Sequence, residues 1–181
     1  LNDQSNQPIV VDGIRLICNG EIYNYKELYK KYHFTPTTDS DCEIIIHLYK
    51  QFGILRTLTY IDGVFAFVLY DENTKRVHVA RDPFGVRPLF YLSKKNTTLG
   101  FASEMKQLIE FKDINDSLTQ FPPGQFLTIT VDDHPSGQYA KSMYSYKDMY
   151  KTPITMNSNN ILKHIYLDSI NNNLTNAVLK R

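Results

Sequence analysis

The chain has 181 residues, 42% hydrophobic and 13% aromatic, which predicts one domain with a piece of a second and about 70% of the unfolded surface buried. Lys and Arg number 20 against 19 Asp and Glu, and the net charge of +1 forms no basic stripe, so no nucleic-acid partner is expected. The longest apolar run, residues 63–70, is far shorter than the roughly 18 to 20 residues that cross a bilayer, so no membrane partner is expected either.

The first residues and the cysteines bear on where the protein works. The opening sequence LNDQSNQP lacks a basic region followed by an apolar one, so it does not resemble a secretory signal. Cys18 and Cys42 form neither a disulfide framework nor a zinc motif, and we interpret them as small buried hydrophobes in a reducing compartment. The expected location is the cytosol. Because residue 1 is Leu1 and not Met, we expect a processed chain or a fragment of a longer product.

A strand and two helices are the first predicted elements. Residues 14–19 read as a strand that ends at Asn19 and Gly20, a pair typical of turns. Two capping boxes then predict helix starts, and a glycine predicts the end of the second helix. These residues are Asn24 and Glu27 for a helix at 25–32, Ser40 and Glu43 for the next helix, and Gly53 for its end.

The middle of the chain changes to the alternation and β-branched content of strands. Predicted strands lie at residues 64–70 and 76–80, which form a hairpin, and at 89–92, 98–102, 125–131 and around 139–144. A short helix that Ser103 caps is predicted between two of them. Short helices followed by mostly antiparallel strands predict an α+β fold with a layered sheet core.

The last part of the chain is predicted to lie outside the first domain. Residues 146–160 are polar and contain Pro153, which is typical of a linker, so residues 1–145 form the predicted first domain. Residues 161–181 carry apolar side chains at helical spacing and predict an amphipathic helix. The run of asparagines at 171–173 weakens intrinsic helicity, so this helix should depend on packing against a partner.

Few residues could carry chemistry, and they gather at the end of the first predicted strand. The Asn19 amide and the Gly20 N–H could both donate to one developing oxyanion. The carboxylates of Glu21 and Asp41 could hold an ammonium group. The residues alone leave two alternatives open: Asn19 and Gly20 as a simple turn, and Asp41 as a residue that complements a helix dipole.

Six motifs resemble, in order and spacing, the glutamine-hydrolysing domain of asparagine synthetases. They are CNGEIYNYKEL at 18–28, SDCEIIIHLY at 40–49, DGVFAFVLYD at 62–71, RDPFGVRPLFY at 81–91, ASEMKQL at 102–108 and FPPGQF at 121–126. The resemblance covers about residues 8–144. The tail at 161–181 resembles the first helix of the ATP-dependent synthetase domain of that family.

The resemblance implies a fold and a site. The fold would be the four-layer αββα sandwich of N-terminal nucleophile hydrolases, with two antiparallel sheets, here incomplete at its N-terminus. L-glutamine would be the substrate, with Asn19 and Gly20 as its oxyanion hole and Glu21 and Asp41 at its α-amino end. All four would be substrate-binding residues. No cofactor or metal is expected in this chain.

The resemblance also implies a parent protein larger than this chain. In the family an N-terminal cysteine attacks the glutamine amide and its own α-amino group is the base, so the nucleophile is absent here and this fragment alone should be inactive. The parent would use the ammonia, with ATP and Mg²⁺ in its C-terminal synthetase domain, to convert aspartate to asparagine. A homodimer of the parent is left open.

Three alternatives remain open. The chain could belong to another class II amidotransferase, such as amidophosphoribosyltransferase, or be a non-catalytic glutamine-binding module. Arg81 or Arg87 could lie in the glutamine site. The favoured interpretation of this segment is a loop that Pro83 and Pro88 rigidify, with Arg81 and Asp82 paired structurally.

Overall fold

The computed structural model describes residues 6–94, 97–131, 140–146 and 160–179. The chain divides into two compact units, Leu1–Met149 and Tyr150–Arg181. Both sheets belong to the first unit, and helix α4 belongs to the second. Within the described ranges, no helix combines the length and the apolar content that a membrane crossing needs.

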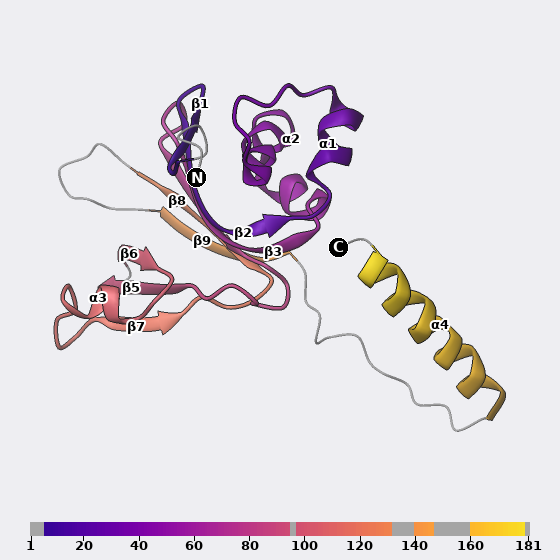
Figure 1. Ribbon diagram of the computed structural model, residues 1–181. Helices are drawn as coiled ribbons and strands as arrows, with labels where there is room; N and C mark the ends of the chain where they lie inside the picture. Colours follow the sequence, from indigo (N-terminus) through magenta and orange to yellow (C-terminus); the bar gives the residue numbers. More distant parts are fainter. Residues whose placement is uncertain (1–5, 95–96, 132–139, 147–159, 180–181) are drawn as a thin grey trace. The chain divides into compact units, whose positions relative to one another are not determined.

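The larger sheet has six strands in the order β1-β2-β3-β4-β8-β9, and all its pairs are antiparallel (Figure 1). The strands are β1 Ile9–Val11, β2 Ile14–Ile22, β3 Gly63–Asp71, β4 Arg76–Arg81, β8 Gln125–Thr130 and β9 Ala140–Ser145. The β2–β3 pairing runs from Ile14 opposite Asp71 to Ile22 opposite Gly63. This pairing brings two segments about 50 residues apart in the chain into one ladder, and the site described below lies at its Ile22 end.

The smaller sheet has three strands in the order β6-β5-β7, also antiparallel. Its strands are β5 Phe90–Lys94, β6 Thr97–Ala102 and β7 Ser117–Gln120. The one-turn helix α3, Lys106–Ile109, follows β6 and contacts it. The predicted hairpin and the four later predicted strands are therefore confirmed, with shifts of one or two residues at their ends.

Helices and the second sheet cover opposite faces of the larger sheet. Helices α1 Tyr25–Tyr32 and α2 Ile44–Tyr60 lie on one face (Figure 1), where β2 and β3 give Leu16, Phe65 and Phe67 to a core with the α2 isoleucines. On the other face, a second core joins both sheets through Ala66, Val79, Leu89, Phe121, Leu127 and Ile129. The predicted α+β fold with two stacked antiparallel sheets is confirmed. Within the described residues, α3 is the one helix beside the smaller sheet.

One predicted strand end is wrong and two strands were not predicted. Strand β2 continues through Asn19 and Gly20 to Ile22, so this pair lies inside a strand and forms no turn. The unpredicted strands are β1, which has three residues, and β7, whose sequence SLTQ has one apolar residue. Both are too short or too polar for alternation to mark them.

The predicted helix starts are correct in place, but the capping boxes are wrong. Asn24 precedes α1, yet its side chain bonds the backbone of Tyr60 and Asp62. Ser40 accepts a hydrogen bond from the Cys42 N–H, without the reciprocal bond from Glu43 that a capping box requires. Ser103 does not cap α3 either.

Gly53 kinks α2 but does not end it. Its φ of 75° and ψ of 169° break the helical geometry, and helical turns resume up to Tyr60. Glycine adopts this positive φ without strain, so the predicted stop becomes a joint between two helical segments.

The second unit contains the predicted terminal helix. Helix α4 spans Asn160–Leu179, so the helix expected at residues 161–181 is confirmed, but its apolar residues do not collect on one face and the predicted amphipathic pattern is wrong. Most of the predicted linker lies outside the described residues. Tyr146, its first residue, belongs to the first unit, because its hydroxyl donates to the Arg81 carbonyl at 2.8 Å and its ring packs on the helix-side core.

Candidate functional site

The structure brings three of the four predicted site residues together at the end of β2. Asn19, Gly20 and Glu21 are consecutive in this strand and pair with residues 64–66 of β3. Alternation along a strand places the Asn19 and Glu21 side chains on one face of the sheet and Cys18 on the other. Asn19 and Glu21 share their face with Ala66, which belongs to the core between the sheets, so they border that core and remain exposed.

Gly20 is required by the close approach of β3. A Cβ atom at this position would lie 2.4 Å from the Val64 carbonyl oxygen and 2.7 Å from the Phe65 Cα. Gly63, on the facing strand, is equally constrained, because its Cβ would lie 2.2 Å from the Glu21 carbonyl oxygen. Two strand backbones therefore approach each other at this end of the ladder in a way that only glycine permits.

The Gly20 N–H faces the edge of β2 away from β3. At that edge Gln7 bonds the Cys18 backbone with both ends of its amide, at 2.8 Å to the N–H and 2.7 Å to the carbonyl. Two residues beyond Gly20, the Ile22 N–H donates to Asp41 Oδ2 at 2.6 Å. Every second residue of an antiparallel strand turns its N–H to the same edge, so Gly20 presents its N–H between these two anchored positions.

Asp41 reaches this edge from outside the sheet. It is the first residue of a 3₁₀ turn, Asp41–Glu43, that precedes α2, and its side chain is half-buried. Cys42, the next residue, directs its thiol to the Gly20 carbonyl at 3.8 Å. The prediction that Asp41 opens a helix is right in position, but the bond to Ile22 gives its carboxylate a structural contact with β2 beyond any dipole effect.

The exposed side chains of Asn19 and Glu21 in β2 lie at long distances from their polar partners. Asn19 Nδ2 lies 3.5 Å from Ser103 Oγ, at the outer limit for a hydrogen bond. Glu21 Oε1 lies 3.7 Å from Arg87 Nη2. Such partners exchange readily for a ligand, so the Ile22 end of β2 offers an amide donor, a backbone donor and two carboxylates at a partly exposed surface.

Arg81 and Asp82 hold together the loop after β4, and this loop brings one residue, Arg87, to the site. Arg81 is buried and donates to three carbonyl oxygens, those of Gly85, Arg87 and Phe121, each at 2.7 Å. Burial lowers the pKa of Arg81, and the nearby charge of Asp82 opposes that change. The Asp82 carboxylate accepts backbone N–H bonds from Phe65, Phe84, Val86 and Arg87.

These contacts divide the two arginines. The structural role favoured for Arg81 is confirmed, but the predicted pair with Asp82 is wrong, because the Arg81 guanidinium donates to three loop carbonyls instead. For Arg87 that interpretation is incomplete, because its guanidinium lies beside Glu21.

Neither cysteine lies at the exposed face of this site. Cys18 and Cys42 are both buried and free, as the composition predicted. The hydrogen bond with the Cys42 thiol, together with burial, raises the pKa of Cys18 well above its usual value. A thiol in this state is a poor nucleophile at neutral pH.

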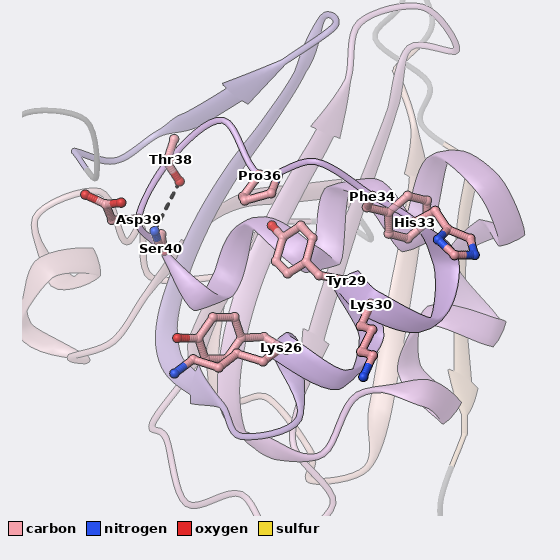
Figure 2. Close-up of a pocket in the computed structure, with 10 residues that line it drawn as sticks. Lys26, Tyr29, Lys30, His33, Phe34, Pro36, Thr38, Asp39 and Ser40 are labelled. Atoms are coloured by element: carbon pink, nitrogen blue, oxygen red, sulfur yellow. Dashed lines mark hydrogen bonds between the residues drawn. The ribbon is translucent and has the colours of Figure 1, made fainter.

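A separate pocket of about 740 Å³ lies on the helical layer, beside α1 and the loop that follows it. Figure 2 shows its lining side chains, among them Lys26, Tyr29, Phe34 and Asp39. Ser40 is the lining residue that adjoins Asp41. The four predicted site residues do not line this pocket, so the candidate site is an open strand edge rather than the larger hollow.

Ser103 is a residue of this site that the sequence analysis missed, because it was predicted only as a helix cap. Arg87 was considered for the glutamine site, although a rigid loop was the favoured interpretation, and its guanidinium does contact a β2 side chain. The sequence around Ser103 carries no signal of its contact, because the folding of another segment brings this residue to β2. In the described ranges no three His, Cys, Asp or Glu side chains gather as a metal site.

Known proteins are similar to this chain over most of its length. It is 37% identical over 177 residues to the asparagine synthetase [glutamine-hydrolyzing] of Gallus gallus, covering 92% of this chain and 31% of that protein. A probable asparagine synthetase [glutamine-hydrolyzing] of Acanthamoeba polyphaga mimivirus is 35% identical over 176 residues, covering 91% and 31%. The chain therefore spans about a third of the length of these relatives.

Solved structures show the same fold. The glutamine phosphoribosylpyrophosphate amidotransferase of B. subtilis, complexed with ADP and GMP, has a TM-score of 0.60 at 24% identity, covering 78% of this chain and 32% of that one. The allosteric regulatory enzyme of purine biosynthesis has a TM-score of 0.61 at 22% identity, covering 80% and 32%. These neighbours confirm the predicted fold. The family profile described as "Glutamine amidotransferase domain" matches residues 1–164, and the chain belongs to this family.

Proposed function

We propose that this chain forms the glutamine-hydrolysing site of a glutamine-dependent asparagine synthetase, at the Ile22 end of β2. The observation that carries the proposal is the gathering, at the Ile22 end of β2, of the Asn19 amide on the sheet face, the Gly20 N–H at the strand edge and the Asp41 carboxylate that bonds Ile22. The family match supports glutamine as the substrate, and the asparagine synthetase relatives support the parent enzyme.

The two carboxylates would hold the α-ammonium group of glutamine. Asp41 is half-buried, so a bound ammonium would be partly desolvated and would gain more from the charge than it does in water. Glu21 would contact the same group from the exposed face, where its Oε1 lies 3.7 Å from Arg87 Nη2.

Asn19 and Gly20 would stabilise the oxyanion of the reaction. A thiolate attacks the side-chain amide carbon of glutamine, and the carbonyl electron pair moves to oxygen, where Asn19 Nδ2 and the Gly20 N–H donate to it. The intermediate collapses, nitrogen leaves as ammonia with a proton from the protonated base, and a thioester remains. Water then hydrolyses the thioester to glutamate and regenerates the thiol.

We propose that the thiolate comes from a residue outside these 181 residues. Cys18 is buried on the helical side of the sheet with a raised pKa, and Cys42 packs against the Gly20 carbonyl from the same side. In the mechanism that the family resemblance implies, one N-terminal cysteine supplies both the thiol and the amine that acts as base.

The fate of the ammonia belongs to the proposed parent. A synthetase domain, to which α4 would belong as its first helix, would use ATP and Mg²⁺ to activate aspartate and form asparagine. Glutamine hydrolysis itself needs neither ATP nor a metal. We place the parent in the cytosol, where its free cysteines stay reduced, and a homodimer is compatible with the proposal.

An amidophosphoribosyltransferase is the second candidate, and the observation in its favour is structural. The solved glutamine phosphoribosylpyrophosphate amidotransferase matches the fold of this chain at a TM-score of 0.60 and an identity of 24%. The asparagine synthetases are 35% and 37% identical over nearly the whole chain, so we favour them.

The test is the substitution Asp41→Asn in the full-length protein. Loss of the charged partner should weaken glutamine binding by on the order of 2 to 4 kcal/mol, seen as a higher KM for glutamine. Asparagine formation from added ammonia should keep its rate, because ammonia bypasses this site.

The matched control is Asp12→Asn, which removes an exposed carboxylate paired with Lys50 at the other end of β2. This control should leave both rates unchanged. If Asp41→Asn lowered the glutamine-dependent and ammonia-dependent rates together, Asp41 would be a folding residue and the site assignment would be wrong.

A further inference from the structure

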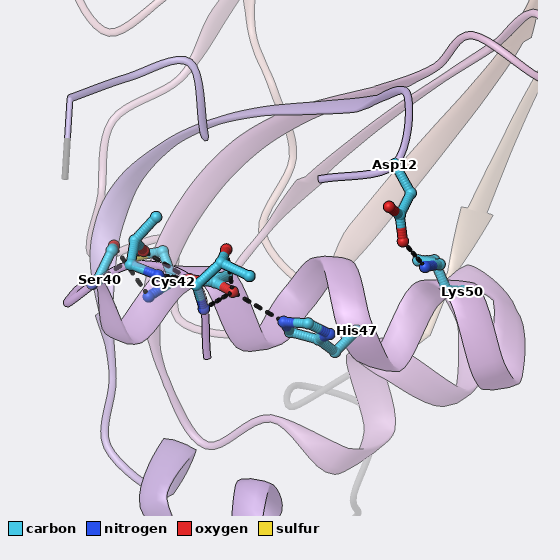
Figure 3. A network of polar contacts seen from close by, with 8 residues as sticks. Asp12, Ser40, Cys42, His47 and Lys50 are labelled. Atoms are coloured by element: carbon cyan, nitrogen blue, oxygen red, sulfur yellow. Dashed lines mark hydrogen bonds and ion pairs between the residues drawn. The ribbon is translucent and has the colours of Figure 1, made fainter. Parts of the chain in front are cut away.

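Glu43 is a buried carboxylate that ties together the loop before Asp41. Its side chain is 0% exposed and takes part in five hydrogen bonds. Thr37 donates to Oε1 through its N–H at 2.7 Å and its hydroxyl at 2.8 Å, and Thr38 donates to Oε2 through both groups at 2.6 Å. His47 Nε2 lies 2.8 Å from Oε1 (Figure 3).

These donors fix the charge of Glu43. Burial alone would raise the pKa of this carboxyl, but hydrogen bonds from Thr38, Thr37 and His47 outweigh burial and lower the pKa to about 2. The His47 ring is itself held between the rings of Tyr29 and Phe34, with centroids at 5.7 Å and 5.4 Å. Glu43 is therefore an ionised group in a rigid setting at neutral pH.

The loop that Glu43 holds leads directly to Asp41. The Thr38 hydroxyl accepts from the Ser40 N–H at 3.2 Å, and the Ser40 carbonyl accepts from the Glu43 N–H at 3.2 Å. Asp41 lies inside this closed turn, and its Oδ2 accepts from the Ile22 N–H at 2.6 Å. Asp41 is thus fixed on one side by the Glu43 network and on the other by β2.

We propose that Glu43 is a positioning residue for glutamine: its network sets the place of the Asp41 carboxylate, which in turn receives the α-ammonium group. This inference rests on the proposed function of Asp41. Glu43 touches no substrate and acts through the turn alone. Its bonds to both Thr37 and Thr38 require a carboxylate, because an amide nitrogen facing the Thr38 N–H would place two donors against each other.

The experiment compares Glu43→Gln with Asp71→Asn in the full-length protein. Asp71 is a matched control, since it is a buried carboxylate that accepts bonds from Tyr49, Asn73 and Thr74 at the opposite end of β3. Glu43→Gln should raise the KM for glutamine about tenfold or more, because a small displacement of a binding group is enough for that loss. The ammonia-dependent rate should not change, and Asp71→Asn should leave the KM for glutamine unchanged.

Amide hydrogen exchange at Ile22, compared between the two variants, separates a local effect on the Asp41 turn from a general loss of stability. Glu43→Gln should speed exchange of this amide, whose acceptor is Asp41, while Asp71→Asn should not. If Glu43→Gln does not fold, Thr38→Val and Thr38→Ser replace it. Valine removes the hydroxyl and should raise the KM for glutamine, whereas serine keeps the hydroxyl and should retain the KM.

The outcomes separate this inference from the proposed function. A raised KM in Asp41→Asn with an unchanged KM and unchanged Ile22 exchange in Glu43→Gln would overturn the positioning role and leave the glutamine site standing. An equal rise in Asp71→Asn would also overturn it, because the effect would then be general destabilisation. No rise in any variant, Asp41→Asn included, would overturn both.

Discussion

The two ends of the β2–β3 ladder use polar residues in opposite ways. At the Ile14 end, the Asp71 carboxylate accepts from the Tyr49 and Thr74 hydroxyls, each at 2.8 Å, and Tyr49 lies 3.2 Å from His78 Nε2. At the Ile22 end, Asn19 and Glu21 are exposed, with their contacts at 3.5 Å and 3.7 Å. Polar groups that satisfy one another build structure, whereas groups with long, replaceable partners are available to a ligand.

The site end has its own buried support. Glu43 supports the turn that holds Asp41, and Asp71 lies at the other end of the ladder. Each of these buried carboxylates accepts hydrogen bonds from hydroxyl and backbone donors. The difference lies in what the network adjoins. The Glu43 network ends at an open strand edge, and the Asp71 network closes on His78 and Thr128.

Lowering the pH should remove the stabilising contributions of the two ends of the ladder in different pH ranges, and this is the largest expected effect. Burial, with the charge of Arg76, lowers the pKa of His78 from its ordinary 6.5 to about 4, so the unfolded chain binds this proton before the folded one does. The contribution of neutral His78 to the free energy of unfolding should therefore be complete above pH 6.5. This contribution should fall by about 3 kcal/mol as the pH drops to 4. Glu43, lowered from 4.5 to about 2, should add a similar loss between pH 4.5 and 2.

Urea unfolding of the chain across this pH range is the measurement, with His78→Gln and Glu43→Gln as the paired variants. Each variant should be less stable than the unsubstituted chain at pH 7. His78→Gln should flatten the pH dependence of stability between pH 6.5 and 4 alone, and Glu43→Gln between pH 4.5 and 2 alone. If His78→Gln retained the full slope between pH 6.5 and 4, the account of the Ile14 end would be wrong.

A smaller effect is expected at Arg87. This side chain is about a third exposed and lies 3.7 Å from Glu21, so Arg87→Met should change the free energy of unfolding by less than about 1 kcal/mol. The KM for glutamine should rise severalfold, since Glu21 loses the contact that orients it. Arg15→Met, which breaks the exposed pair with Glu72 at the other end, is the control and should leave the KM unchanged. An equal KM in both variants would remove Arg87 from the site.

Sequence reasoning found the elements whose signal is local. Helix α1 matches its predicted bounds, and the β3–β4 hairpin was found because its β-branched run has a clear turn at residues 72–75. It failed at Asn19 and Gly20, which are typical of a turn. Gly20 is required instead by the backbone of Val64 and Phe65, a constraint that only the pairing of distant strands creates.

The same limit applies to the site. Asp41 was singled out by a motif, yet its bond to Ile22 spans 19 residues and no spacing rule predicts it. Glu43 was predicted to complete a capping box, and tertiary packing turned its carboxylate to Thr37 and Thr38 instead. Arg87 and Ser103 reach β2 from distant loops, so their role depends on a fold that had to be known first.

The most direct measurement of the central claim is a structure of the full-length protein with L-glutamate, the product of glutamine hydrolysis, bound. The α-ammonium group should lie at hydrogen-bond distance, about 3 Å, from the Asp41 carboxylate. A side-chain carboxylate oxygen of the bound glutamate should face Asn19 Nδ2 and the Gly20 N–H. Glutamate bound instead in the pocket between Lys26, Tyr29 and Ser40, with the β2 edge free, would contradict it.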